Sequence, residues 1–269
     1  MTNLIIHPIS QRLIDRYLNR PAHGLLLTGD RGVGLHTIAH YIAKHIDERA
    51  YIHVVAPDEK QTIAIETVRG LYKLTRAQRE EALIVIIDDA DGMGREAQNA
   101  LLKLLEEPTE HVYFILTSHR PQMLLDTIIS RTQQIEVGRV PSEATDQLFN
   151  IGHEESMRRQ IRFMADGLPA EAQRLIIDPH YLAERSQLIR DGRKFLEGDS
   201  YTKLLIIKQY SNDREMADRF LASLEKLVSY TLFLKHGVEH VSMLERIDTI
   251  RIRLQQNGHI RTQLSHLLA

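Results

Sequence analysis

The stretch 24–37 contains three glycines whose spacing could allow them to bind phosphate. An apolar run at 25–28 predicts a short buried strand, and Ile38, Ile42 and Ala43 form one stripe of a predicted helix. Between these elements lie the three glycines, Gly29, Gly32 and Gly34. Backbone amides of such a turn close around phosphate groups, and the start of the following helix adds partial positive charge. Strand, glycine turn and helix in this order are therefore typical of a phosphate-binding loop.

Two of the usual ligands of such a loop are missing. The full pattern is Gly, four residues, Gly, Lys, and then Ser or Thr. Gly29 and Gly34 fit it, but Leu35 and His36 occupy the last two positions, and Thr37 follows one residue too late. A charged hydrogen bond is worth roughly 1.5–3 kcal/mol, so we expect the loss of two ligands to weaken nucleotide binding roughly 10²–10⁴-fold. A tight strand-to-helix turn without any ligand is the alternative interpretation.

An acidic pair, Asp88 and Asp89, follows the most apolar run of the chain, residues 82–87. That run predicts a central strand, and carboxylates at the end of such a strand are where phosphate-loop NTPases hold Mg²⁺. Helix capping or a solvated loop would explain the same pair without a nucleotide. His36 and His40 lie one helical turn apart, but no third ligand stands out, so we predict no metal site at the histidines.

Composition excludes several classes of function. The chain has 269 residues, and 34 basic side chains nearly balance 36 acidic ones, so no global field attracts it to nucleic acid or to a membrane. The absence of cysteine excludes disulfides and cysteine-ligated zinc. No apolar run approaches the length of a membrane span, and the first residues lack the features of a signal peptide. We therefore expect a cytoplasmic protein with no membrane partner.

Strands and helices are predicted to alternate as far as about residue 140. The predicted strands are 25–28, 51–55, 82–87, 112–116 and 133–137, and the predicted helices are 10–18, 35–45, 62–74 with Thr62 as its cap, 95–105 and 124–129. This alternation favours an α/β fold with a parallel sheet covered on both faces.

No convincing strand follows Pro141. Breaks at 167–169 and 197–199 place domain boundaries near residues 140 and 197, which gives three domains, 1–140, 141–197 and 198–269. Apolar residues at three- and four-residue spacing predict helices at 217–234, 241–255 and 259–268. Such a helical tail could pack on its own domain or assemble with helices of a partner.

Later segments resemble the clamp-loader branch of AAA+ proteins. The stretch 99–108, Asn-Ala-Leu-Leu-Lys-Leu-Leu-Glu-Glu-Pro, is nearly a signature of that branch, and Ser130-Arg131-Thr132 is similar to its Ser-Arg-Cys motif. The run 114–121, which passes from a predicted strand into a turn, also resembles the corresponding segment of that branch. The resemblance covers about residues 1–175 well and the tail less well. It implies an AAA+ P-loop domain over 1–140, a small helical lid over 141–197 and an all-α collar for oligomerisation over 198–269.

The resemblance also assigns roles to single residues. Residues 29–36 match the Walker A position, Asp88 matches the Mg²⁺-associated Walker B aspartate, and Asp89 stands in place of the catalytic glutamate. Ser118 matches the sensor-1 hydroxyl, whereas Ala170 stands where ATP-using relatives carry a sensor-2 arginine. The chain departs from the family pattern at Leu35, His36, Asp89 and Ala170. All four departures imply that this chain binds no ATP tightly.

Arg131 matches the arginine finger, which in such assemblies reaches into a neighbour's nucleotide site. A finger can be worth roughly 10³–10⁵ in rate. The resemblance thus implies a subunit that is no enzyme by itself and completes another subunit's site, where ATP and Mg²⁺ are bound. A surface arginine after a short helix is the plainer interpretation of Arg131.

The function implied is that of a non-hydrolysing clamp-loader subunit in the DNA polymerase III holoenzyme. Its partners would be gamma/tau-type loader ATPases, a delta-type subunit, the sliding clamp and the backbone of primed DNA, with Arg95 and Lys103 as candidate DNA contacts. One alternative is an active gamma/tau-type ATPase, which needs a lysine where Leu35 stands. The other is a degenerate AAA+ scaffold outside replication.

Overall fold

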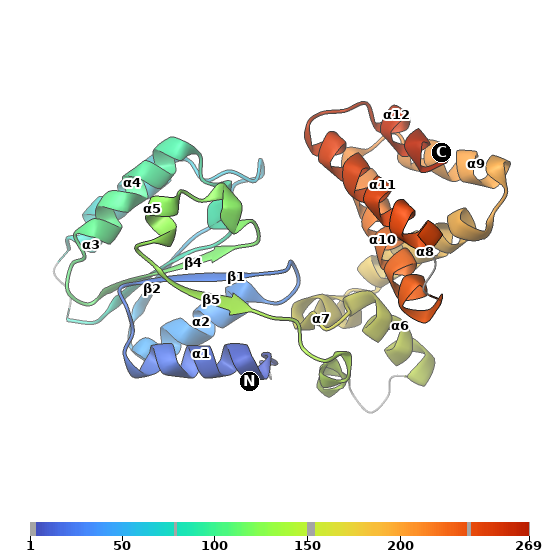
Figure 1. Ribbon diagram of the computed structural model, residues 1–269. Helices are drawn as coiled ribbons and strands as arrows, with labels where there is room; N and C mark the ends of the chain where they lie inside the picture. Colours follow the sequence, from blue (N-terminus) through green and yellow to red (C-terminus); the bar gives the residue numbers. More distant parts are fainter. Residues whose placement is uncertain (1–3, 78–79, 150–153, 236–237, 269) are drawn as a thin grey trace. The chain divides into compact units, whose positions relative to one another are not determined.

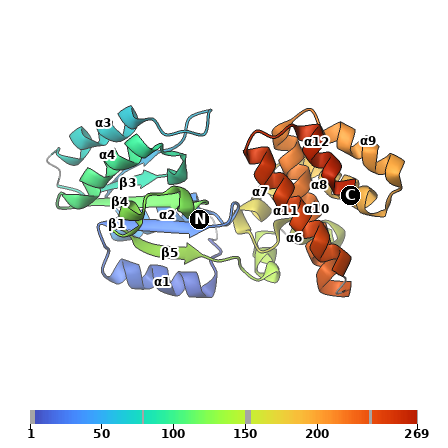
Figure 2. The same cartoon turned by 45° about the horizontal axis from the view of Figure 1, so that its top comes forward.

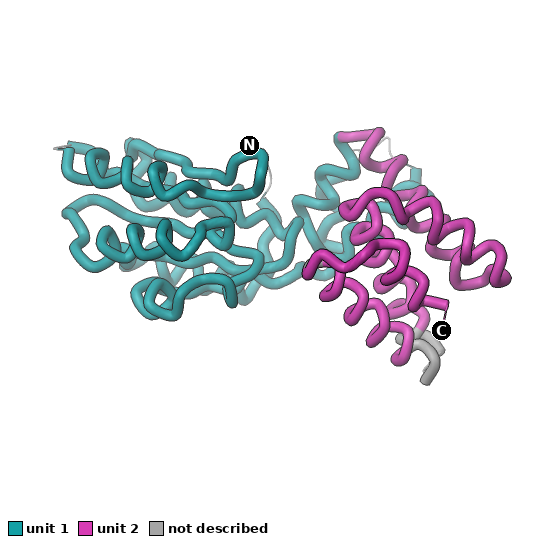
Figure 3. Tube along the Cα trace, turned by 90° about the horizontal axis from the view of Figure 1, so that it is seen from above, with its two compact units in different colours: residues 1–177 teal, residues 178–269 magenta. Residues whose placement is uncertain are grey.

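The computed structural model describes residues 4–77, 80–149, 154–235 and 238–268. The chain divides into two compact units, residues 1–177 and 178–269 (Figure 3). Helix α8 (Pro179–Glu197), which the sequence analysis assigned to the lid, belongs to the second unit. The three-domain division with boundaries near 140 and 197 stays a prediction.

A five-stranded parallel sheet forms the first unit, in the order β2-β3-β4-β1-β5. Its strands are β1 (Gly24–Gly29), β2 (Tyr51–Val55), β3 (Leu83–Ile87), β4 (Val112–Ser118) and β5 (Gln133–Val137). Every residue of β3 is buried, as its continuous apolar sequence predicts for a strand covered on both faces. The predicted α/β fold with a parallel sheet is confirmed.

Helices cover both faces of this sheet (Figures 1 and 2). Helices α1 (Pro8–Asn19) and α2 (Leu35–Ile46) share an apolar cluster with Leu25 and Leu27, whereas Leu26 points into the cluster on the other face. That other face is covered by α3 (Ile65–Thr75), α4 (Arg95–Glu106) and α5 (Asp126–Ile129). Alternate residues of β1 therefore anchor the two helical layers, because successive side chains of a strand point to opposite faces.

The predicted start of α3 is wrong. Thr62 does not cap the helix, which begins at Ile65 after Ala64. Instead, the Thr62 backbone N–H and hydroxyl both donate to Asp58 Oδ1, at 2.9 and 3.1 Å. A nearby aspartate that bonds to backbone amides of the loop competes with helix formation, and the helix begins two residues later than predicted.

Two helices complete the first unit, α6 (Glu155–Ala165) and α7 (Pro169–Ile177), after a 3₁₀ segment, η3 (Ser142–Leu148). The turn between α6 and α7 is tied to the segment after β5, since Val140 N donates to Gly167 O at 2.9 Å. Gly167 has φ +73°, and a Cβ there would lie 2.1 Å from Val140 O. Only glycine fits this close approach, which joins α7 to the sheet domain.

The second unit is helical. It contains α8, α9 (Ser200–Tyr210), α10 (Arg214–Lys235), α11 (Val238–Gln255), α12 (Ile260–Ser265) and a final 3₁₀ turn, η4 (His266–Leu268). In its core the Tyr210 ring stacks on Phe220 at 4.5 Å, and the Tyr210 hydroxyl donates to buried Asp191 at 2.8 Å. Within the described residues, no helix is both long enough and apolar enough to cross a membrane.

Candidate functional site

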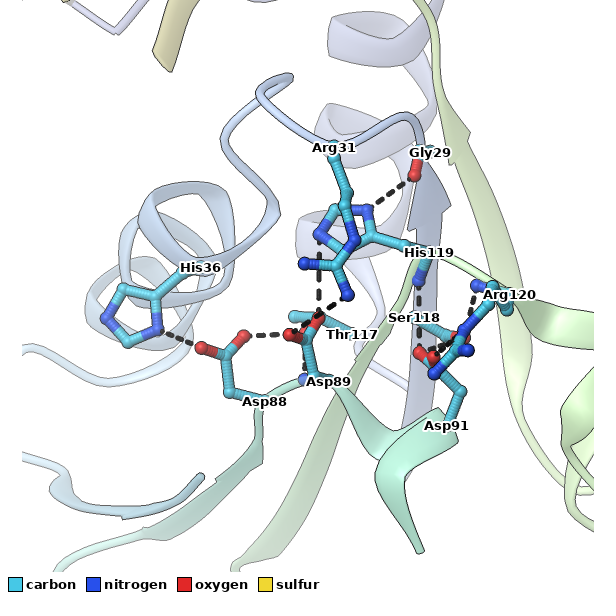
Figure 4. Close-up of polar contacts among 10 residues, drawn as sticks. All are labelled: Gly29, Arg31, His36, Asp88, Asp89, Asp91, Thr117, Ser118, His119 and Arg120. Atoms are coloured by element: carbon cyan, nitrogen blue, oxygen red, sulfur yellow. Dashed lines mark hydrogen bonds and ion pairs between the residues drawn. The ribbon is translucent and has the colours of Figure 1, made fainter. Parts of the chain in front are cut away.

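The acidic pair lies at the carboxyl edge of the sheet and is already engaged by the chain itself (Figure 4). Asp88 follows β3, and its two carboxylate oxygens accept from Thr117 Oγ1 at 2.7 Å and face His36 Nδ1 at 2.9 Å. An ionised carboxylate can only accept, so His36 Nδ1 carries the hydrogen of this contact. The group expected to bind Mg²⁺ therefore has a protein donor at each of its oxygens.

Asp89 faces two further side chains of the same site (Figure 4). His119 Nε2 lies 3.5 Å from Asp89 Oδ1, and Arg31 Nη2 lies 4.0 Å from Asp89 Oδ2. The Asp89 backbone is left-handed, with φ 45°, and its N–H donates to Thr117 Oγ1 at 2.9 Å. The predicted Walker A residue His36 and both aspartates are thus brought together, with Thr117 between the aspartates.

The sequence analysis missed His119 as a member of this site. Its side chain is only 16% exposed, and Nδ1 lies 2.7 Å from Gly29 O at the end of β1. A carbonyl oxygen only accepts, so Nδ1 is the protonated nitrogen. The imidazole therefore spans from the first glycine of the loop to Asp89. The available signal was its position directly after β4, the strand that pairs with β1 in the sheet.

Ser118, the predicted sensor-1 residue, belongs to a neighbouring network. Its hydroxyl donates to Asp91 Oδ1 at 2.9 Å, and Arg120 Nε donates to Asp91 Oδ2 at 2.8 Å. The Asp91 side chain, in the 3₁₀ turn η1 (Ala90–Gly92), is 1% exposed. Burial alone raises the pKa of Asp91, but the hydrogen bonds from Arg120 and Ser118 outweigh it and lower that pKa from 3.8. It is Thr117, one residue earlier, whose hydroxyl contacts Asp88.

Two of the three loop glycines have left-handed backbone conformations, which favour glycine. Gly32 and Gly34 have φ values of 90° and 98°, and Gly34 precedes the first residue of α2. Leu35, at the expected lysine position, is 2% exposed and packs in the apolar cluster under α2. His36 at the hydroxyl position is half exposed and turned to Asp88. A side chain that would reach phosphate is thus replaced by one that stabilises the core.

Helix α7 closes over the loop. The backbone N–H groups of Ala170 and Glu171 both donate to Gly32 O, at 2.9 and 3.1 Å. A Cβ on Gly32 would lie 2.9 Å from Glu171 Cβ, so the approach requires glycine. Ala170, at the sensor-2 position, is also the nearest neighbour of Gly34. The N-terminal amides of α7 are therefore used by the loop carbonyl.

Arg139 adds a charged link between the loop and the end of α6. Its guanidinium contacts Asp30 of the loop at 2.7 Å and Asp166 at the end of α6 at 2.6 Å. All three side chains are about half exposed. An exposed pair contributes about 0–1 kcal/mol, so Arg139 restrains the loop weakly compared with the two backbone bonds to Gly32.

His36 and His40 lie one turn apart on α2. The rings of His36 and His40 are 4.7 Å apart, and burial, followed by the charges of His36 and Lys44, lowers the pKa of His40. No group of three or more histidine, aspartate or glutamate side chains able to hold a metal occurs among the described residues.

Arg131 lies at the opposite edge of the sheet. It comes two residues before β5, and its carbonyl would lie 3.2 Å from a Cβ on Gly24, the first residue of β1. The loop begins at the other end of β1, at Gly29, so about 17 Å of strand separates the two sites. Arg131 Nη2 pairs with Glu106 Oε1 at 2.9 Å, and Nη1 donates to Thr127 O at 3.2 Å.

The two predicted DNA contacts lie on α4 without forming one row. Arg95 begins the helix, and both it and Lys103 are exposed. Eight residues separate them, which turns one about 80° from the other around the helix. Lys103 lines a cavity of about 400 Å³ between the ends of α3 and α4, together with Tyr72, Glu106 and Glu107. Their contact with DNA stays a prediction.

The fold has relatives among solved structures. A DNA polymerase III gamma subunit-related protein from Thermotoga maritima superposes with a TM-score of 0.64 at 19% identity, over 96% of this chain and 97% of that one. The RuvB branch-migration motor of the same organism superposes with a TM-score of 0.51 at 17% identity, over 86% and 78%. The fold is therefore of the AAA+ type.

Within the AAA+ type of fold, the relatives found by sequence are subunits of DNA polymerase III. The family described as "DNA polymerase III, delta subunit" matches residues 46–141, which include Asp88, Ser118 and Arg131 but begin after the glycine loop. DNA polymerase III subunit delta' of Bacillus subtilis is 32% identical over 142 residues, and that of Pseudomonas aeruginosa is 29% identical over 223. Subunit tau of Escherichia coli is 30% identical over 168 residues.

These matches support the predicted resemblance to clamp-loader subunits, and both delta' and tau names occur among the relatives. The alignments cover 54%, 52% and 71% of this chain for the Escherichia coli, Bacillus subtilis and Pseudomonas aeruginosa proteins. They cover 26%, 43% and 67% of those proteins, so the chain spans less than two thirds of the length of the first two.

Proposed function

We propose that this chain is a delta'-like clamp-loader subunit that does not hydrolyse ATP and completes a neighbouring subunit's ATP site with Arg131. The observation that carries the proposal is the separation of two sites on one sheet. Arg131 lies at the amino edge, about 17 Å along β1 from the chain's own glycine loop. If Arg131 contacts a nucleotide, that nucleotide therefore belongs to another subunit.

The state of the chain's own loop supports the same proposal. Leu35 is buried in the core, both aspartates face donors of the protein, and the Gly32 carbonyl accepts from α7. Phosphate and Mg²⁺ would have to displace these contacts without a lysine or a hydroxyl to replace them. We therefore propose that no nucleotide is held tightly here and that ATP and Mg²⁺ act in the neighbour.

The partners follow from this role and are part of the proposal. They are gamma/tau-type ATPase subunits, a delta-type subunit, the sliding clamp and primed DNA in the cytoplasm. The second unit, with its helical core, would supply the collar contact to other subunits. Relatives named tau match as well as those named delta', so the active ATPase is the competing function.

The test is the assembled loader with Arg131→Ala. The ATPase activity of the one site that Arg131 serves should fall roughly 10³–10⁵-fold, so total clamp- and DNA-stimulated activity should fall in part and clamp loading more. Arg131→Lys should match the alanine variant, because a single ammonium does not reproduce the planar pair of donors. Folding should change by about 0.5 kcal/mol or less, as for other surface substitutions.

Arg12→Ala, at an exposed position of α1, serves as the control arginine. It should leave ATPase activity and clamp loading unchanged. Wild-type clamp loading by both Arg131 variants would show that Arg131 is a structural arginine and would overturn the proposal.

A further inference from the structure

Glu106 holds Arg131 in this structure. The pair joins Glu106 Oε1 to Arg131 Nη2 at 2.9 Å, while Arg131 Nη1 donates to the Thr127 carbonyl at 3.2 Å. The two side chains are 47% and 38% exposed, so the pair lies at the surface. Each of the two terminal nitrogens of Arg131, which could bind a neighbour's phosphate oxygens, therefore already contacts an acceptor of the same chain.

Local helix chemistry does not favour a glutamate at this position. Glu106 is the last residue of α4, where the helix presents its unpaired carbonyls and the negative end of its dipole. An acidic side chain is disfavoured there unless a cation compensates it, and Arg131, 25 residues further along the chain, supplies that cation. Glu107 follows directly and is also exposed, but its charge is not part of the pair with Arg131.

We propose that Glu106 is a positioning residue that keeps Arg131 in a resting conformation until a neighbouring subunit binds ATP. This inference rests on the proposed role of Arg131. The γ-phosphate offers a guanidinium more negative charge than one carboxylate, and both donors can engage its oxygens. An exposed ion pair of this kind is weak. Release of Arg131 from Glu106 therefore changes the equilibrium between its resting and nucleotide-bound conformations by at most about fivefold. The restraint is thus strong enough to orient Arg131 and weak enough to yield to the nucleotide.

The experiment measures steady-state ATPase kinetics of the assembled loader containing Glu106→Gln. Glutamine keeps the length and an acceptor oxygen but removes the charge that competes with phosphate. The KM for ATP of the served site should fall about two- to fivefold, with kcat unchanged within twofold, because Arg131 has already left Glu106 when ATP is bound. A general loss of structure would instead raise KM or lower kcat.

Two further variants make the test specific. Glu107→Gln changes the net charge equally, one residue away, and should leave KM unchanged. Glu106→Gln placed in an Arg131→Ala background should also have no effect, because the partner of the restraint is gone.

The outcomes separate the two proposals. If Arg131→Ala lowers the ATPase activity but Glu106→Gln leaves KM unchanged or raises it, the positioning role is wrong and the finger role stands. An equal change in Glu107→Gln, or one that persists without Arg131, likewise overturns the positioning role. If Arg131→Ala has no effect, the finger role fails and the positioning role fails with it.

Discussion

The two edges of the sheet hold polar clusters of similar composition that differ in how accessible they are. At the carboxyl edge, Asp88 and Asp89 face His36, His119 and Arg31 of the same chain. At the amino edge, Arg131 pairs with the Glu106 carboxylate, and the two side chains are 38% and 47% exposed. A site whose charges satisfy one another has little left to bind a nucleotide. A weak surface pair can exchange its partner for a group on another molecule.

The largest expected effect at the carboxyl edge is on ATP affinity. The isolated chain should bind ATP roughly 10²–10⁴-fold more weakly than a loop with its lysine and hydroxyl, because the two charged contacts are missing. Calorimetry with Mg-ATP measures this, with a gamma/tau-type subunit as the positive control. Sub-micromolar affinity, or turnover that Asp88→Asn abolishes, would remove the difference between the two edges.

Leu35→Lys asks whether the loop can be repaired by one substitution. Leu35 is 2% exposed among apolar side chains, so a lysine there should destabilise the protein by about 2–4 kcal/mol and leave ATP binding weak. Chemical denaturation measures the loss. His36→Lys is the matched control, because His36 is half exposed and the substitution should cost about 0.5 kcal/mol or less. Equal stability of the two variants would mean that Leu35 contributes no packing.

Arg120→Ala tests what stabilises the buried carboxylate of Asp91 at the carboxyl edge. It removes a charged partner of Asp91, and we expect a loss of about 1–3 kcal/mol at neutral pH. The folded-state pKa of Asp91 is lowered, so its contribution to stability is complete above about pH 3.8. That contribution is lost as the pH falls through the folded-state value.

The variant should therefore lose less stability than the wild type on acidification below pH 4, since part of the lowering of the pKa comes from Arg120. Urea denaturation at several pH values, with Arg12→Ala as control, measures this difference. Parallel pH dependence of Arg120→Ala and the wild type would show that Arg120 does not set the pKa of Asp91.

The smallest effect is expected at the link between the loop and the turn that joins α6 to α7. Arg139→Ala removes two exposed ion pairs, worth about 1 kcal/mol or less together. The amides of Ala170 and Glu171, which bond to Gly32 O, should exchange with solvent up to about fivefold faster. Amides in the middle of β3 provide the internal control. A uniform change across the sheet would mean that Arg139 stabilises the whole unit and not this link.

The sequence predicted the sheet because its signal is local. The apolar runs of β3 and β1 are properties of consecutive residues, and they set the strand positions directly. The start of α3 could not be predicted in this way, since Asp58 outcompeted Thr62 through bonds within the loop. The position of α8 depends on its packing in the second unit, where Leu188 and Phe195 join the core of the later helices.

The sequence predicted most residues of the candidate site, but it did not predict which groups their side chains contact. The two aspartates and the glycines are recognised by spacing, and the structure brings them together with His36. Thr117 and Ser118 are successive residues of β4 and point to opposite faces, so the Ser118 hydroxyl contacts Asp91 and Thr117 lies beside Asp88. His119 carried no motif of its own, because its role comes only from the pairing of β4 with β1.

The order of the strands sets a waiting time during synthesis. β1 pairs with β4 and β5, and its first partner pair, Gly24 with Phe114, is separated by 114 − 24 = 90 residues. At about 5–20 residues per second, β1 leaves the ribosome roughly 5–20 s before β4 can join it. During that interval α1 and α2 can cover Leu25 and Leu27, but β1 has neither of its neighbouring strands. The nascent chain is therefore most exposed to aggregation and to chaperones while residues 30–112 are being made.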